Sequence, residues 1–111
     1  METITWNDFE KIDIRVGTII KTEEFPEARK PAYKLTIDFG DVLGIWKSSA
    51  QITKRYQADQ LIGQQVIAVT NFPPKKIATF TSDLVLGIYE ENGDVVLLQP
   101  QQQVGNGLKI G

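Results

Sequence analysis

The feature that most constrains this chain is a period of two in its apolar residues. Ile12, Ile14, Val16, Thr18 and Ile20 alternate with mostly polar residues. Side chains at alternate positions of a β-strand point to one face of the sheet. Residues 32–39 repeat the alternation. The pattern therefore predicts two half-buried strands, over residues 12–21 and 32–39.

Shorter segments predict the remaining elements. Thr5 can cap a helix over residues 5–11, with Asp8 beside the positive end of the helix dipole. Asn92-Gly93 predicts a type I′ hairpin. We expect loops over residues 23–31 and at 40–41, short helical turns over 52–62, and strands over 44–49, 66–71, 84–89 and 95–99.

These elements together predict an all-β fold. Five or more short strands and a helical insert after strand three fit a five-stranded Greek-key OB-fold barrel with a short N-terminal helix. Gly17, at the centre of the first strand, suits a bend or bulge. A β-sandwich is the alternative. With 111 residues, 41% of them apolar, residues 1–111 are expected to form one domain.

The composition excludes most catalytic chemistry. Cysteine and histidine are absent, so the chain lacks thiol nucleophiles, imidazole bases and the usual zinc ligands. It carries no Walker A, dinucleotide-binding or nucleophile-elbow motif. Asp13, Asp38 and Asp83 are possible acids or bases, but a solvated carboxylate is the ordinary explanation for each. We expect no enzyme activity, no cofactor and no metal.

Charge and hydropathy limit the location and the partners. The first residues lack the basic start and apolar run of a secretory signal, and no later window is apolar enough to cross a bilayer. We therefore expect a cytoplasmic protein without membrane insertion. The net charge is −2, so binding of nucleic acid would need a local basic patch.

Residues 71–77 are the segment richest in candidate binding groups. Two prolines stiffen it, so Lys75 and Lys76 would lose less backbone entropy on meeting a ligand. These lysines can hold phosphates while Phe72 stacks on a base. The alternative is a proline turn with solvated lysines and a buried Phe72. Hydroxyl-rich stretches at 47–49 and 80–83 can bond phosphate or peptide backbone.

Four segments carry a family likeness. Residues 13–17, 25–35, 47–53 and 71–75 resemble, in order, the CsaA family of export-related chaperones. More widely, the chain resembles the tRNA-binding domain appended to some methionyl- and phenylalanyl-tRNA synthetases. The resemblance implies an OB-fold homodimer that binds unfolded or precursor polypeptides in concert with the SecA export motor, or alternatively binds tRNA by shape.

The resemblance also implies site residues. Asn71, Lys75 and Ser82 match positions that tRNA-binding relatives use near the nucleic acid, and Lys76 extends that loop. Asp83 stands where many such relatives carry methionine, which weakens the basic face. We expect Trp6 and Phe9 at the dimer interface. The further residues expected at the peptide- or tRNA-binding site are Trp46, Lys47, Ser48, Ser49, Phe72 and Phe80.

Overall fold

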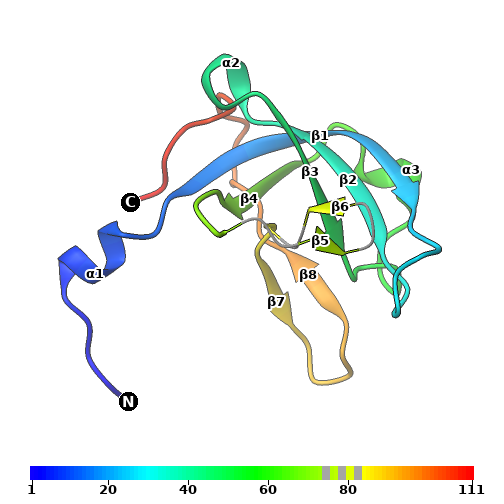
Figure 1. The fold of residues 1–111 in the computed structure, drawn as a ribbon, viewed down its shortest axis with the longest axis horizontal. Helices are drawn as coiled ribbons and strands as arrows, with labels where there is room; N and C mark the ends of the chain where they lie inside the picture. Colours follow the sequence, from blue (N-terminus) through cyan, green and yellow to red (C-terminus); the bar gives the residue numbers. More distant parts are fainter. Residues whose placement is uncertain (74–75, 78–79, 82–83) are drawn as a thin grey trace.

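The chain folds into a mostly β structure with few, short helices (Figure 1). The computed structural model describes residues 1–73, 76–77, 80–81 and 84–111. Its helices are α1 (Trp6–Glu10), α2 (Gly40–Leu43) and α3 (Ala58–Leu61). Its strands are β1 (Ile14–Glu24), β2 (Tyr33–Asp38), β3 (Ile45–Ala50), β4 (Gln65–Val69), β5 (Lys76–Ile77), β6 (Phe80–Thr81), β7 (Gly87–Tyr89) and β8 (Val95–Leu97).

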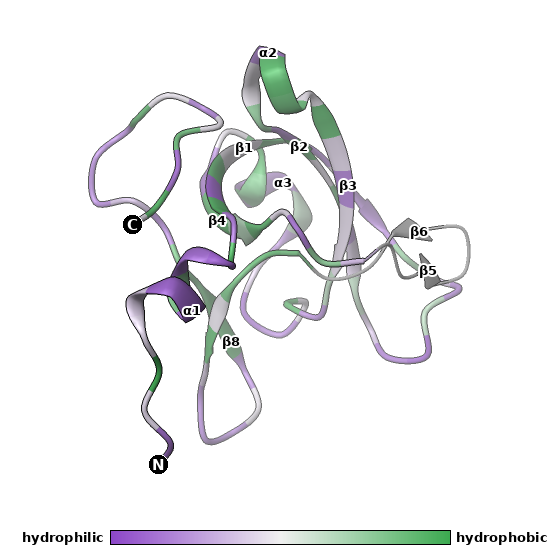
Figure 2. Cartoon of the chain, turned by 60° about the vertical axis from the view of Figure 1, so that its left-hand side comes forward, coloured by the Kyte–Doolittle hydropathy of each residue, from purple (hydrophilic) through white to green (hydrophobic). Residues whose placement is uncertain are grey.

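Four strands form the main antiparallel sheet, in the order β3-β2-β1-β4. The sheet curves round a common centre (Figure 2). Residues 84–86 run between its two edges. Leu84 and Leu86 bond to the backbone of β4, and the amide of Leu84 also bonds to Ser48 on β3. The result is a barrel-like arrangement, as the strand pattern predicted.

The core lies inside this curved sheet. Tyr33, Leu35 and Ile37 alternate with half-buried residues along β2, and Phe39 continues the same face. Leu35 and Ile37 are completely excluded from solvent. The prediction for residues 32–39 is therefore confirmed, with the strand running from Tyr33 to Asp38.

The predicted faces of the first strand are wrong at both ends. Ile12 lies before β1 and is 41% exposed, while Ile20 is 43% exposed. The pairing of β1 with β2 shifts register between Ile19 and Lys21. Ile19 lies before this shift and pairs with the buried Ile37, so it already faces the core, with 0% exposure, in place of Ile20. The extra residue at the bulge reverses the alternation of side chains only beyond Ile19.

Gly17 is needed for close packing. A Cβ atom at this position would lie 2.6 Å from Cγ2 of Ile37 and 2.8 Å from the ring of Phe39. Both neighbours are core residues that cannot easily move. Sequence reasoning assigned a bend or bulge to Gly17; the bulge lies between Ile19 and Lys21.

The β7–β8 hairpin differs from the predicted type I′ turn. The amide of Gly93 donates to the carbonyl of Glu90, and the amide of Glu90 donates to the carbonyl of Asp94. Glu91 and Asn92 therefore occupy the corner, and Gly93 follows with a φ of +90°. This is the geometry of a three-residue loop with a left-handed glycine, which also explains the preference for glycine there.

Two segments outside the barrel core have local contacts of their own. Helix α1 is closed by a capping box, in which Asp8 N donates to the Thr5 hydroxyl and Thr5 N donates to the Asp8 carboxylate. The predicted Thr5 cap is confirmed, and α1 projects away from the barrel (Figure 1). The expected loop at 23–31 contains the end of β1 and Phe25, which packs with Ala32 in a small satellite core.

Candidate functional site

A groove lies where the exit of β4 approaches the start of β3. It has a volume of about 410 Å³. Its lining residues come from three segments far apart in the sequence: Ile45, Trp46, Lys47, Thr70, Phe72, Pro73 and Leu84. Five of these seven side chains are apolar, so the groove can bury apolar groups of a ligand.

The groove combines a fixed wall with exposed apolar side chains. Trp46 is held in place, because its Nε1 donates to the Leu43 carbonyl at 2.7 Å and its ring meets Phe39 edge-on at 5.6 Å. Ile45 is 61% exposed and Phe72 is 53% exposed. A ligand that covered these two side chains would gain by removing their apolar surface from water.

The hydroxyl-rich end of β3 divides between surface and core. Lys47 is exposed and lines the groove. Ser48 is fully buried: its Oγ donates to the Ser49 carbonyl at 3.0 Å and accepts from the amide of Leu84 at 3.0 Å. Ser48 therefore connects β3 to the segment that closes the barrel. Ser49 is 4% exposed and lines a separate groove beside the β7–β8 hairpin.

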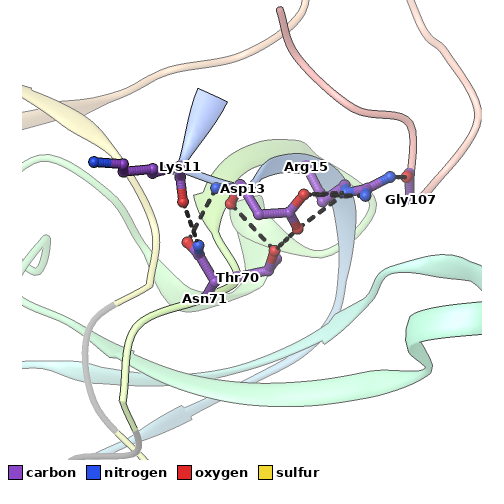
Figure 3. A network of polar contacts seen from close by, with 6 residues as sticks. All are labelled: Lys11, Asp13, Arg15, Thr70, Asn71 and Gly107. Carbon is purple, nitrogen blue, oxygen red and sulfur yellow. Dashed lines mark hydrogen bonds and ion pairs between the residues drawn. The ribbon is translucent and has the colours of Figure 1, made fainter. Parts of the chain in front are cut away.

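Asn71 joins the groove to the N-terminal segment (Figure 3). Its Nδ2 donates to the Lys11 carbonyl at 2.6 Å, and its Oδ1 accepts from the amide of Asp13 at 3.0 Å. Both ends of the amide thus bond to the backbone just before β1. Since Phe72 follows directly, these bonds set where the groove loop leaves β4.

Asp13 forms the second half of this network (Figure 3). Its carboxylate accepts from Arg15 Nε at 3.1 Å and from the hydroxyl of Thr70. Arg15 also donates to the carbonyl of Gly107 at 3.1 Å. The hydrogen bond from Arg15, followed by that from Thr70, holds the pKa of Asp13 below its ordinary value. Asp13 is therefore a charged structural tie between β1, β4 and the C-terminal segment.

The predicted site residues are only partly brought together. Lys47 and Phe72 share the groove with Trp46. Lys75, Ser82 and Asp83 lie outside the described residues. Lys76 and Phe80 belong to the paired strands β5 and β6, where only the backbone is described.

The predicted interface residues lie on α1. Trp6 is 63% exposed, Phe9 is half-buried, and their rings are 5.3 Å apart. The barrel leaves most of the Trp6 surface uncovered.

Sequence reasoning missed Ile45, Thr70, Pro73 and Leu84 as groove residues. Pro73 stood inside the segment already singled out, so its position was a usable signal. No sequence signal marked Ile45 or Leu84, because their proximity to Phe72 depends on how β3, β4 and residues 84–86 assemble.

Two of the candidate acids, Asp13 and Asp38, make structural contacts. In residues 1–73, 76–77, 80–81 and 84–111, no three acidic side chains gather as a metal site would require. Asp13 is bonded to Arg15 and Thr70, and Asp38 accepts from the amide of Gly40.

The described part of the chain contains no helix long and apolar enough to span a membrane.

Comparison with known families gives one match over most of the chain. Residues 14–109 match the family described as "Putative tRNA binding domain". Methionine–tRNA ligase of Porphyromonas gingivalis is 34% identical over 110 residues, which are 98% of this chain and 16% of that enzyme. The chain thus spans about one-sixth of the length of this ligase.

Two solved structures are similar over their whole length. Chaperone CsaA of Bacillus anthracis has 56% sequence identity and a TM-score of 0.92, with 99% of this chain and 100% of that chain covered. The CsaA chaperone protein of Picrophilus torridus has 55% identity and a TM-score of 0.90, with 98% and 100% covered.

Proposed function

Because this chain belongs to the CsaA family within the putative tRNA-binding domain family, we propose that it is a chaperone that binds unfolded or precursor polypeptides for export. Binding is non-catalytic and takes place on the outside of the barrel. The ligases among the relatives are enzymes as whole proteins, and this chain corresponds to 14–16% of their length.

The groove beside Phe72 is the observation that carries this proposal. Its exposed apolar side chains, Ile45 and Phe72, lie beside the cation of Lys47. A folded ligand buries most of its large apolar side chains in its core, whereas an unfolded polypeptide exposes them. The groove therefore fits one or two apolar side chains of an extended chain, with Lys47 able to meet a nearby carboxylate.

Structure-selective binding of tRNA is the second candidate. Lys47 is exposed on β3, and Lys75 and Lys76 follow Phe72 closely in the sequence. Cations of this kind contact the phosphate backbone, and such contacts weaken as salt is added. The similarity to methionine–tRNA ligases supports this candidate, while the net charge of −2 counts against a strong general attraction to RNA.

The proposed assembly is a cytoplasmic homodimer of single-domain, five-stranded OB-fold subunits. Trp6 and Phe9 would contact the other subunit, because α1 projects from the barrel and leaves Trp6 63% exposed. SecA as a partner stays a prediction that rests on the family likeness alone.

Fluorescence anisotropy with two labelled ligands separates the two functions. A labelled unfolded precursor peptide and a labelled tRNA are each titrated with the protein at low and moderate salt. The proposal predicts peptide binding that changes little with salt, because apolar burial is not screened. Binding of tRNA alone, falling steeply with salt, would instead support the RNA function.

Two substitutions assign the binding to the groove. Phe72→Ser should weaken peptide binding, and Lys47→Glu should weaken tRNA binding more than it weakens binding of a neutral peptide. Lys30→Glu is the matched charge control, because Lys30 is exposed in the loop between β1 and β2, on a different segment. If Phe72→Ser and the wild-type protein bind peptide equally, the groove is not the peptide site.

A further inference from the structure

The β7–β8 hairpin has an open edge. It projects from the barrel as a two-stranded sheet, and within the described residues β7 pairs only with β8 (Figure 1). Bonded and non-bonded pairs alternate along an antiparallel ladder. Glu90 N donates to Asp94 O and Leu98 N donates to Leu86 O, so the pairs Gly87–Leu97 and Tyr89–Val95 are non-bonded. Their backbone groups therefore point away from the partner strand.

The two outer edges of the hairpin differ. On the β8 side, the amide of Leu97 is already used, because it donates to the Tyr56 hydroxyl at 3.0 Å. On the β7 side, the outward groups belong to Gly87 and Tyr89, and no strand in the described part of the chain covers them. An uncovered edge of this kind is a template for another extended chain.

One face of the hairpin borders a second groove. Gly87, Tyr89, Val95 and Leu97 lie on this face, and residues 49–52 form the opposite wall. The groove has a volume of about 190 Å³, room for one large side chain. Three of its lining residues, Ala50, Ile52 and Leu97, are buried and apolar.

Tyr89 and Gly87 shape the mouth of this groove. The Tyr89 side chain is 85% exposed. Gly87 contributes no side chain, and a Cβ atom there would lie 2.5 Å from Cγ1 of Val95. The Val95 side chain therefore fills the space above Gly87. A strand added beside β7 would place one of its side chains next to the exposed Tyr89 ring.

The charges at the mouth favour one kind of neighbour. Arg55 lies 3.8 Å from a carboxylate oxygen of Glu90 and 3.5 Å from one of Asp94. Lys54 has no such carboxylate among the described residues, and its Nζ lies 3.6 Å from the position that a Cβ of Gly93 would take. Of these two cations, Lys54 is the one without a carboxylate partner among the described residues, and it lies beside Gly93, which lines the groove.

We propose that the open edge of β7 takes an extended polypeptide as an added strand, with a large apolar side chain in the groove between the hairpin and residues 49–52 and an acidic residue near Lys54. This proposal rests on the proposed chaperone function and adds a second, strand-forming contact. Main-chain hydrogen bonds to Gly87 and Tyr89 tolerate many sequences, and the groove and Lys54 supply a preference for an apolar residue close to an acidic one.

Backbone methylation of the ligand tests the strand directly. A fluorescein-labelled synthetic peptide with alternating apolar residues and one glutamate is prepared with a single N-methyl group at each position in turn. Strand addition predicts losses of about tenfold at alternate positions, because every second amide of an added strand points to its partner. Equal losses at neighbouring positions, or no losses, would overturn the proposal.

Substitutions in the protein test the side-chain preference. Tyr89→Ala should weaken binding of this peptide. Lys54→Glu should weaken it as well, and should strengthen binding when the glutamate of the peptide is replaced by lysine. Lys30→Glu, which makes the same charge change on a distant exposed loop, should leave both affinities unchanged. If Lys54→Glu and Lys30→Glu behave alike, the acidic preference is overturned.

The outcomes separate this proposal from the proposed function. Wild-type peptide binding that Phe72→Ser weakens, but that shows no alternation with methylation and no response to Tyr89→Ala, overturns strand addition and leaves the chaperone function standing. A wild-type protein that binds no peptide at all overturns both.

Discussion

Asn71 lies beside the candidate groove, and its side chain bonds to the backbone of the segment before β1. Its amide bonds to the backbone of Lys11 and Asp13, one residue before Phe72. The family likeness places Asn71 at a ligand, and that role stays a prediction. No sequence pattern linked Asn71 to residues about 60 positions earlier, because the link depends on how β1 and β4 pair.

We expect Asn71→Ala to lower the free energy of unfolding by about 1 kcal/mol, because it removes two hydrogen bonds at a partly solvated site. Urea unfolding followed by circular dichroism measures the change. Asn7→Ala, at an exposed position on α1, is the control and should change stability less. If Asn71→Ala unfolds at the same urea concentration as the wild-type protein, the two hydrogen bonds of Asn71 do not stabilise the fold.

Asp13 makes stability depend on pH. The pKa of Asp13 is lowered below 3.8, first by the hydrogen bond from Arg15 and then by that from Thr70. A carboxyl group with a depressed pKa in the folded state stabilises the protein above its unfolded pKa, and this contribution is lost as the pH falls through the folded pKa. The wild-type protein should therefore lose more stability below about pH 4 than Asp13→Asn does. If the urea midpoints of the two proteins fall by the same amount as the pH is lowered, the carboxylate of Asp13 does not contribute to the pH dependence of stability.

At the scale of elements, the regular alternation of β2 could be predicted from sequence and that of β1 only in part. Tyr33, Leu35 and Ile37 face the core as the period of two requires. In β1 Ile19 faces the core in place of Ile20, the bulge after Ile19 then reverses the alternation, and no residue type there signals either feature. The strand at 44–49 was predicted, but its burial was not, because Ser48 is buried by residues 84–86, which are distant in sequence.

Ser48 gives the test at this scale. Ser48→Ala leaves the amide of Leu84 without its hydroxyl partner in a buried position, so we expect a loss of about 1–3 kcal/mol in the free energy of unfolding. Thr3→Ala removes a hydroxyl from the exposed N-terminal segment and should have little effect. Similar losses from both substitutions, measured by urea unfolding, would show that Ser48 does not join β3 to the Leu84 segment.

At the scale of the whole molecule, the projecting N-terminal segment exposes apolar side chains outside the barrel. Ile4, just before α1, is 68% exposed and Trp6 is 63% exposed, and the Trp6 ring lies 5.3 Å from that of Phe9 on the same helix. Light scattering at micromolar concentration should therefore give the mass of a dimer. Trp6→Ser should shift the mass toward that of a monomer, whereas Asn7→Ala, on the same helix, should not. A wild-type monomer would contradict the proposed interface.

The most direct test of the central claim is the affinity of an unfolded precursor peptide for the wild-type protein and for Phe72→Ser, measured by anisotropy at two salt concentrations. We predict that the wild-type protein binds with little dependence on salt, and that Phe72→Ser binds about tenfold more weakly because it loses a large part of its buried apolar contact. No peptide binding by the wild-type protein, alongside salt-sensitive binding of tRNA, would contradict the chaperone function and favour an RNA-binding one.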